Sequence, residues 1–217
     1  EIPDPLMWAV GHVQTAKRAI ALMNSHWFKT ASLVPEPSFF DCHACHHPMN
    51  DMRWQPGDMQ GALPPGSIRL NDASLTMLRI IAQRKTPELA AELINGTRNW
   101  HKASLSSRES VISAGAALDN LLDRIETALK KTTFSKADLQ GIANDLFEQA
   151  GKGEYRDYTS AEQAVMAVDM IVITLGDNDR LKADVDRLYK LVENENSFSP
   201  KDFASETRNM SGRFKAL

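Results

Sequence analysis

The chain has 217 residues, of which 42% are hydrophobic and 24% charged, and its formal net charge is -3. These values are typical of a globular protein that is long enough to bury a substantial core. So small a net charge provides no electrostatic attraction to nucleic acid or to an anionic membrane, and we expect neither as a partner. The sequence lacks the run of about 18 apolar residues that a transmembrane helix needs, so no membrane span is predicted.

The first predicted helix runs from Leu6 to about Phe28. Prolines precede it, and its apolar residues recur at the helical period: Leu6, Val10, Val13, Ala16, Ile20 and Met23. This helix also carries His12 and His26. On one continuous helix the two histidines would lie near the same face but about 21 Å apart along the axis, so they could not bind the same metal ion.

Residues 29–70 contain six prolines and three glycines, which exclude a long helix or strand. We predict a long loop with little regular structure, and a loop of this length in a compact domain usually has a function.

Within this loop lies Cys42-His43-Ala44-Cys45-His46, which has the Cys-x-x-Cys-His spacing of a c-type haem attachment site. In such a site the two thiols form thioethers with the haem vinyl groups, and the histidine that follows binds the iron as an axial ligand. The spacing therefore predicts that Cys42 and Cys45 bind haem covalently and that His46 is the proximal iron ligand. The chain has no other cysteine for a structural disulfide.

Other uses of these residues are less favourable. Two cysteines and adjacent histidines in one turn would crowd a zinc ion, and structural zinc sites usually take a second pair of ligands from elsewhere. A thioredoxin-like redox pair would need a βαβ pattern, which the flanking sequence lacks. A disulfide between Cys42 and Cys45 would leave the histidine cluster unexplained. We expect one covalent haem c and, because bacteria attach haem c outside the cytoplasmic membrane, a periplasmic or exported protein.

A haem in the loop would pack against apolar side chains. The candidates serve equally well in ordinary loop packing, and the sequence does not separate the two roles: Phe39, Phe40, Met49, Met52, Trp54 and Met59.

The sixth ligand of the iron would decide its chemistry. A second imidazole or a methionine suits electron transfer, whereas an open position allows ligand binding or catalysis. His43 and His47 adjoin the proximal ligand and should not reach the opposite face. The first candidates are His26, which ends the helix that leads into the loop, and His12, whose small neighbours leave room for a planar group. His101 ranks third, and the loop methionines rank lower.

Beyond the loop the sequence predicts helices alone, with no convincing strand alternation or repeat. The start signals are Asn71 or Asp72, Thr86-Pro87, Ser107, Ser135, and Ser160 with Gln163. The predicted helices cover about 72–85, 87–100, 107–131, 136–150, 160–175, 178–193 and 199–214. The fold class is therefore all-α, a helical bundle with one long irregular haem-binding loop. We expect a single haem c domain over 1–217, with the first helix and loop in 1–70 and the bundle in 71–217.

Six segments, 4–11, 15–22, 40–48, 52–55, 158–164 and 198–203, resemble the C-terminal haem domain of bacterial multihaem cytochromes c related to the nitrifier tetrahaem cytochrome. The specific part of this resemblance is the Cys-x-x-Cys-His-His core, and it implies haem binding by Cys42 and Cys45 with His46 proximal. Such proteins carry further haem motifs upstream, which this chain lacks. The chain begins at Glu1 without a signal peptide, so we take it as a mature single-haem relative or as a piece of a longer protein. In a longer protein the distal ligand could come from outside this sequence, and His12 or His26 could serve a neighbouring haem.

The sequence thus favours an electron-transfer protein over an enzyme, and the partner would be a redox protein or other haem domains. The helices show no phosphate-binding glycine loop and no nucleophile elbow. Two alternatives stay open. One is a haem protein with an open distal site that binds or reduces a small molecule, and the other is a helical interaction module of a larger multihaem complex.

Overall fold

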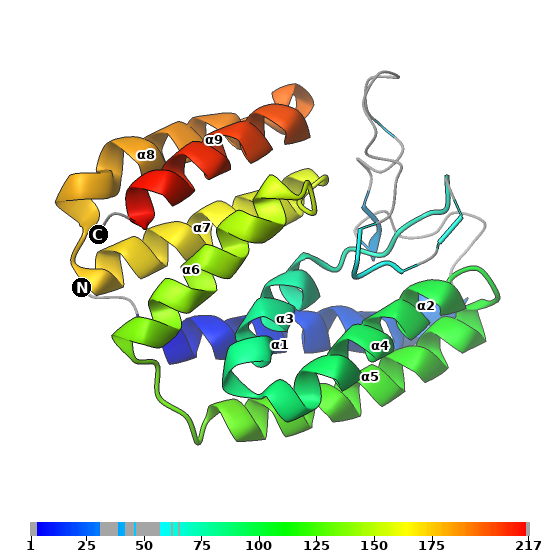
Figure 1. The fold of residues 1–217 in the computed structure, drawn as a ribbon. Coiled ribbons are helices and arrows are strands. Elements are labelled where there is room, and N and C mark those ends of the chain that lie inside the picture. Colours follow the sequence, from blue (N-terminus) through cyan, green and yellow to red (C-terminus); the bar gives the residue numbers. More distant parts are fainter. Residues whose placement is uncertain are drawn as a thin grey trace.

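The computed structural model describes residues 4–30, 39–41, 46, 57–61, 63–64 and 66–215. This part of the chain is all-α, as the sequence predicts (Figure 1). Its elements are α1 (Pro5–Met23), α2 (His26–Thr30), α3 (Ala73–Lys85), α4 (Pro87–Ala103), α5 (Arg108–Leu129), α6 (Lys136–Gly151), α7 (Tyr158–Leu175), α8 (Asn178–Leu191), the 3-10 turn η3 (Glu195–Ser197) and α9 (Pro200–Phe214). Among these helices we find none that is both long enough and apolar enough to cross a membrane.

The N-terminal helix is shorter than the sequence predicts. α1 ends at Met23, and the backbone N–H of Asn24 closes it by donating to the carbonyls of Ile20 and Ala21. His26 then begins the separate helix α2. The prediction that His12 and His26 share one helix is therefore wrong. The cause is the pair Asn24-Ser25, because both side chains compete for backbone hydrogen bonds and favour helix ends.

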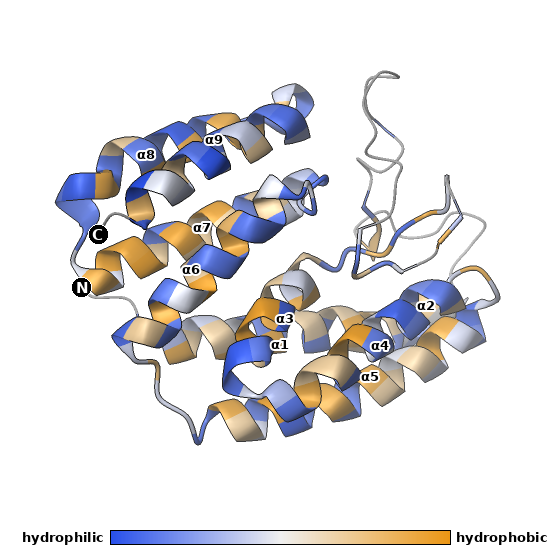
Figure 2. Ribbon diagram, in the orientation of Figure 1, coloured by the Kyte–Doolittle hydropathy of each residue, from blue (hydrophilic) through white to orange (hydrophobic). Residues whose placement is uncertain are grey.

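α3 lies at the centre of the fold, and nine of its 13 residues are buried. Leu75, Leu78 and Ile81 belong to an apolar cluster shared with α1, α4 and α5. Met77 and Ile80 belong to a second cluster, shared with α6, α7, α8 and α9. Figure 2 shows hydrophobic and hydrophilic residues alternating along these helices, as amphipathic helices require. α3 therefore contributes buried side chains to both apolar clusters.

Side-chain caps fix most helix starts. Ser107, Ser135 and Ser199 accept the expected backbone hydrogen bonds at the starts of α5, α6 and α9. α7 begins two residues before the predicted Ser160, because Asp157 accepts from the Ser160 backbone N–H at 2.6 Å and takes the cap position itself.

The described part of the long loop is fastened to the start of α3. Phe40 and Leu70 form an isolated antiparallel bridge. The backbone N–H of Asp41 donates to the Arg69 carbonyl at 2.9 Å, and that of Asn71 donates to the Phe39 carbonyl at 2.8 Å. The chain is therefore held beside the start of α3 at Asp41, the residue that directly precedes Cys42.

Candidate functional site

The residues predicted to attach haem fall mainly outside the described part of the chain. Cys42 and Cys45 lie outside it, and His46 is described only as an exposed residue in a bend. Their roles stay predictions. Of the apolar loop residues, Phe39 and Met59 are buried in the cluster around α1, whereas Met49, Met52 and Trp54 lie outside the described residues.

One face of α1 lines two adjoining hollows. The first measures about 110 Å³ and is lined by Thr15, Ala16, Ala19, Met23, Phe39, Asn71, Asp72, Ser74, Leu75 and Trp100. The second measures about 380 Å³ and is lined by Trp8, Gly11, His12, Thr15, Asn71, Ala73, Ser74, Thr159 and Gln163. Thr15, Asn71 and Ser74 line both, so the two hollows form one trough along α1, which we call the α1 trough.

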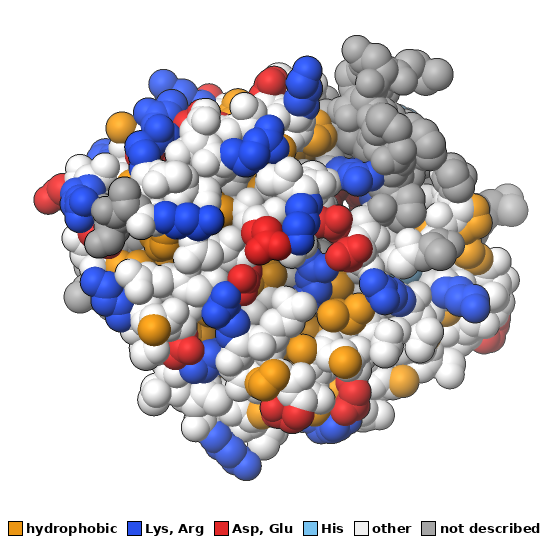
Figure 3. All heavy atoms as spheres, in the orientation of Figure 1, with side chains coloured by type: hydrophobic (Ala, Val, Ile, Leu, Met, Phe, Trp, Pro, Cys, Tyr) orange, Lys and Arg blue, Asp and Glu red, His pale blue; other side chains and the backbone are white. Residues whose placement is uncertain are grey.

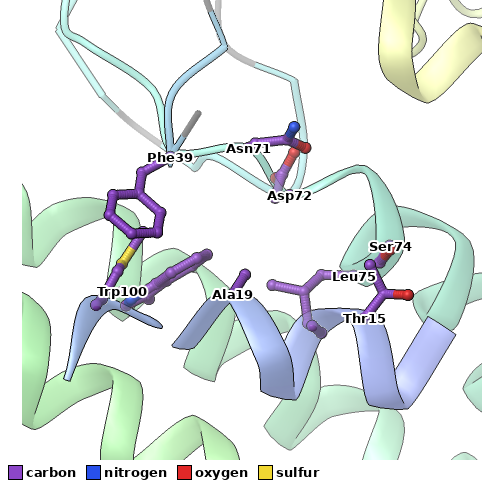
Figure 4. A pocket seen from close by; sticks show the side chains of 10 residues that line it. Thr15, Ala19, Phe39, Asn71, Asp72, Ser74, Leu75 and Trp100 are labelled. Atoms are coloured by element: carbon purple, nitrogen blue, oxygen red, sulfur yellow. The ribbon is translucent and has the colours of Figure 1, made fainter. Parts of the chain in front are cut away.

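Figure 4 shows how the first hollow is built. The rings of Phe39 and Trp100 stand at one end, and the side chains of Ala19 and Leu75 form the floor. The hydroxyl groups of Thr15 and Ser74 lie at the other end, toward the second hollow. An apolar surface with a few polar groups at its rim is typical of a ligand site.

His12 is the ionisable side chain of the α1 trough that lacks a partner. The residue is only 6% exposed, and its Nε2 is buried without a hydrogen bond. Its ring meets the Trp8 ring edge-on, with 5.4 Å between centroids. Burial lowers the pKa of His12 to about 4, so the imidazole is neutral at pH 7. A neutral imidazole with a free ring nitrogen is the form that binds a metal ion.

Gly11 leaves the wall beside His12 open. A Cβ at this position would meet no atom within 4 Å. Glycine inside a helix costs about 1 kcal/mol relative to alanine, and no packing contact of the described residues requires it here. An open glycine next to an unpartnered imidazole fits the approach of a flat group such as haem.

The other two histidine candidates have different surroundings. His26 is exposed at the start of α2. On the same helix, the Phe28 ring meets the Phe39 ring edge-on, with 5.4 Å between the ring centroids. α2 therefore adjoins the end of the α1 trough from which the chain leads to the motif. His101 is fully buried, and its Nε2 already pairs with Asp72 Oδ2 at 2.9 Å. Of the three, His12 combines burial with an unpartnered ring nitrogen, on a residue that lines the α1 trough.

A polar cluster that the sequence did not reveal lies beside the α1 trough. The sequence predicts Asn71 or Asp72 as the cap of α3. Asp72 occupies the cap position without a side-chain cap hydrogen bond, whereas Asn71 Oδ1 accepts from the Ala73 backbone N–H at 3.3 Å. Its Oδ2 instead accepts from Gln60 Nε2 at 2.7 Å and pairs with His101 Nε2. Burial, and next the negative charge of Asp72, raise the pKa of Asp157. These contacts join four distant segments, so no local pattern in the sequence could have shown them.

The described residues contain no group of three or more His, Cys, Asp or Glu side chains placed to hold a metal ion. Toward a haem they offer the unpartnered imidazole of His12, whose chemistry fits axial ligation of an iron, with apolar side chains and an open glycine along the α1 trough. In the comparisons with known proteins, no family model matches the chain, and neither does a curated protein or a solved structure.

Proposed function

We propose that this chain is a periplasmic or exported c-type haem domain that relays electrons. Cys42 and Cys45 would hold one haem covalently, His46 would bind its iron on one side, and His12 would bind it on the other. The observation that carries the proposal is the neutral, unpartnered imidazole of His12, a residue that lines the α1 trough, together with the fastening of Asp41 beside the same trough.

A bound haem would supply a one-electron couple at its iron, and the residues around it would tune that couple. Phe39, Leu75 and Trp100 would exclude water from the macrocycle, and burial of this kind shifts a haem potential. The bridge between Phe40 and Leu70 would hold the attachment loop against the start of α3. The protein part of the mechanism is therefore positioning, burial and axial ligation.

Ligation by His12 favours electron transfer over the alternative with an open distal site. Two imidazoles fill both axial positions and leave no iron site for a small molecule. His26 is the second candidate for this role, because α2 lies at the end of the α1 trough nearest the motif.

The partner would be a redox protein or other haem domains. On the face shown in Figure 3, basic and acidic side chains are interspersed. That face therefore presents no large patch of one charge.

The test is the visible spectrum of the protein expressed with the cytochrome c maturation machinery, with and without carbon monoxide. We expect a covalent, six-coordinate, low-spin haem that ignores carbon monoxide. His12→Ala should become high-spin or bind carbon monoxide, whereas the matched variant His26→Ala should keep the wild-type spectrum.

Other spectra would support other functions or another distal ligand. Absence of a covalent haem band would reject the proposal and make zinc the next candidate. A wild type that binds carbon monoxide would support the open-site alternative. A spectral change in His26→Ala alone would make His26 the distal ligand, and no change in either variant would leave His101, a loop methionine or a ligand from outside this sequence. Partner binding that survives replacement of the haem by a redox-inert analogue would support the interaction-module alternative.

A further inference from the structure

Trp8 and His12 form an aromatic pair that α1 itself creates. They stand one turn apart on the helix, a spacing that places two side chains on the same face, and both residues line the second hollow of the α1 trough. Their ring centroids lie 5.4 Å apart, with an angle of 84° between the ring planes. Aromatic rings favour this edge-on arrangement, so the contact restrains the rotation of the imidazole.

The His12 ring is not held in place by a hydrogen bond at Nε2. That atom is buried without a partner among the described residues. The hydroxyl group of Thr15, on the next turn of α1, donates instead to the Gly11 carbonyl at 2.9 Å. A histidine that binds a metal ion usually has the plane of its ring fixed by a hydrogen bond from its other nitrogen. For His12, the ring contact with Trp8 is the restraint that the described residues provide.

Trp8 is itself fixed by the core. Its side chain is half-buried and packs against both apolar clusters, so side chains from both parts of the core restrain it. A tryptophan held in this way can determine how the neighbouring imidazole is turned.

We propose that Trp8 is a positioning residue for the axial ligand: its edge-on contact fixes the orientation of the His12 imidazole and so keeps that ring on the iron. The inference rests on the proposed function, in which His12 is the distal ligand. Trp8 would act through His12 and would not bind the iron itself. Loss of the tryptophan ring would leave the imidazole free to turn and easier to displace.

Two properties of the ferric holoprotein report on this restraint. The orientation of an axial imidazole determines how the iron d orbitals split, so a change of orientation moves the low-field g value of the low-spin EPR spectrum. Cyanide has to displace His12 in order to bind, so a weaker restraint raises the affinity for cyanide. Because an edge-on aromatic pair changes an equilibrium constant roughly 3- to 10-fold, we expect an effect of that size.

The test compares wild-type holoprotein with the variants Trp8→Leu and Trp8→Phe. Leucine removes the aromatic edge, whereas phenylalanine keeps one. The matched control is Phe134→Leu, because Phe134 is likewise a half-buried aromatic residue that packs against both apolar clusters, but it does not line the α1 trough. The low-field g value and the cyanide dissociation constant are measured for each protein, and circular dichroism checks that each is folded.

Trp8→Leu should shift the low-field g value and bind cyanide roughly 3- to 10-fold more tightly than the wild type. Trp8→Phe should return both values toward those of the wild type, and Phe134→Leu should leave both unchanged. If Trp8→Leu does not fold, Trp8→Met takes its place, since methionine fills irregular space without an aromatic edge.

Wild-type values in Trp8→Leu would overturn the inference, and so would equal changes in Phe134→Leu, which would show a general loss of packing. Equal changes in Trp8→Phe and Trp8→Leu would also overturn it, because the aromatic edge would then have no part in the effect. These results are obtained on protein that holds covalent haem and whose spectrum changes in His12→Ala. A missing haem band or an unchanged His12→Ala spectrum contradicts the proposed function together with this inference, so the two failures are distinct.

Discussion

At the scale of single residues, burial keeps the His12 imidazole neutral at pH 7, and neutral imidazole is the form that can bind a metal ion. The imidazole is buried with a bare Nε2, an arrangement that costs folding free energy unless a partner binds that nitrogen. A histidine selected for packing alone would be replaced by an apolar residue without loss. The cost therefore supports a role in binding.

The pH dependence of stability follows from the pKa of His12, about 4. This value lies below the ordinary value near 6.5 of the unfolded chain, so the contribution of the neutral imidazole is complete above about pH 6.5 and is lost as pH falls toward 4. Between pH 8 and pH 5 we expect a loss of about 2 kcal/mol. Ligation of an iron by His12 would also oppose its protonation and so would lower its pKa further.

Urea unfolding of wild type and His12→Leu at pH 8 and pH 5 measures this loss. The variant should lose less stability between the two values, by about 2 kcal/mol. Equal losses in wild type and His12→Leu would show that His12 does not titrate in this range.

A second prediction at this scale concerns Gly11. At both Gly11 and Gly212, the latter on α9, a Cβ would have no described atom within 4 Å, so alanine fits both sites. In a chain that cannot attach haem, each alanine should raise the free energy of unfolding by roughly 0.8–1 kcal/mol through helix propensity. With haem attached, only Gly11→Ala should perturb the absorption spectrum, because only Gly11 lines the α1 trough. Identical spectra for both variants would place the macrocycle away from Gly11.

The surroundings of a single residue could be predicted from the sequence where they depend only on its neighbours in the chain. The neighbours of His12 predict room for a planar group, and a Cβ at Gly11 would meet no described atom within 4 Å, while the role of His12 itself stays a prediction. The buried stripe of α1 differed from the predicted one, since Ala9 and His12 are buried whereas Val10 is only half-buried. Which face of a helix meets its neighbours depends on tertiary packing, and periodicity alone fixes that face only to within one position.

At the scale of elements, capping decides where the helices begin. α6 starts at a capping box, in which Ser135 Oγ accepts from the Asp138 N–H at 3.1 Å and Asp138 Oδ2 accepts from the Ser135 N–H at 2.8 Å. The hydrogen bond from Lys85, followed by those from Ser135, lowers the pKa of Asp138 to about 2. This box therefore also ties α6 to the end of α3.

Removal of the cap tests its contribution. Ser135→Ala should lower the free energy of unfolding by about 1 kcal/mol, because one backbone N–H of the first turn loses its acceptor. The matched control is Thr133→Ala, at an exposed position just before α6. Thermal or urea unfolding of both variants gives the difference, and a loss no greater than that of the control would show that water replaces the cap.

Helix boundaries were predictable where a strong cap has no competitor, as at Ser107, Ser135 and Ser199. They were missed where two signals compete. Asp157 displaced Ser160 at the start of α7, and Asn24 ended α1 inside a sequence whose apolar period continues. In both places the choice depends on contacts outside the local window, which the sequence pattern does not contain.

At the scale of the whole molecule, α3 joins the two parts of the core. Helix content alone predicted the all-α class, but it did not show that one helix would be shared by two apolar clusters. α1 and α4 pack on one side of α3, with α5 packed against α1 and α4, and α6 and α7 pack on the other side. α8 and α9 contact the rest of the fold through α6 and α7. An element shared in this way should make the two clusters unfold together.

Leu78→Ala tests this cooperativity. Leu78 is fully buried in the cluster with α1, α4 and α5, and its truncation should cost about 2–5 kcal/mol. If the clusters form one cooperative unit, the slowest-exchanging amides of α5 and of α9 should both exchange faster, by the same factor of roughly 30 or more. Native-state hydrogen exchange measures both helices in one experiment. Met166→Ala, at a half-exposed position of α7, should change neither. Acceleration confined to α5 would instead show two units that unfold separately, with α3 serving as a contact between them.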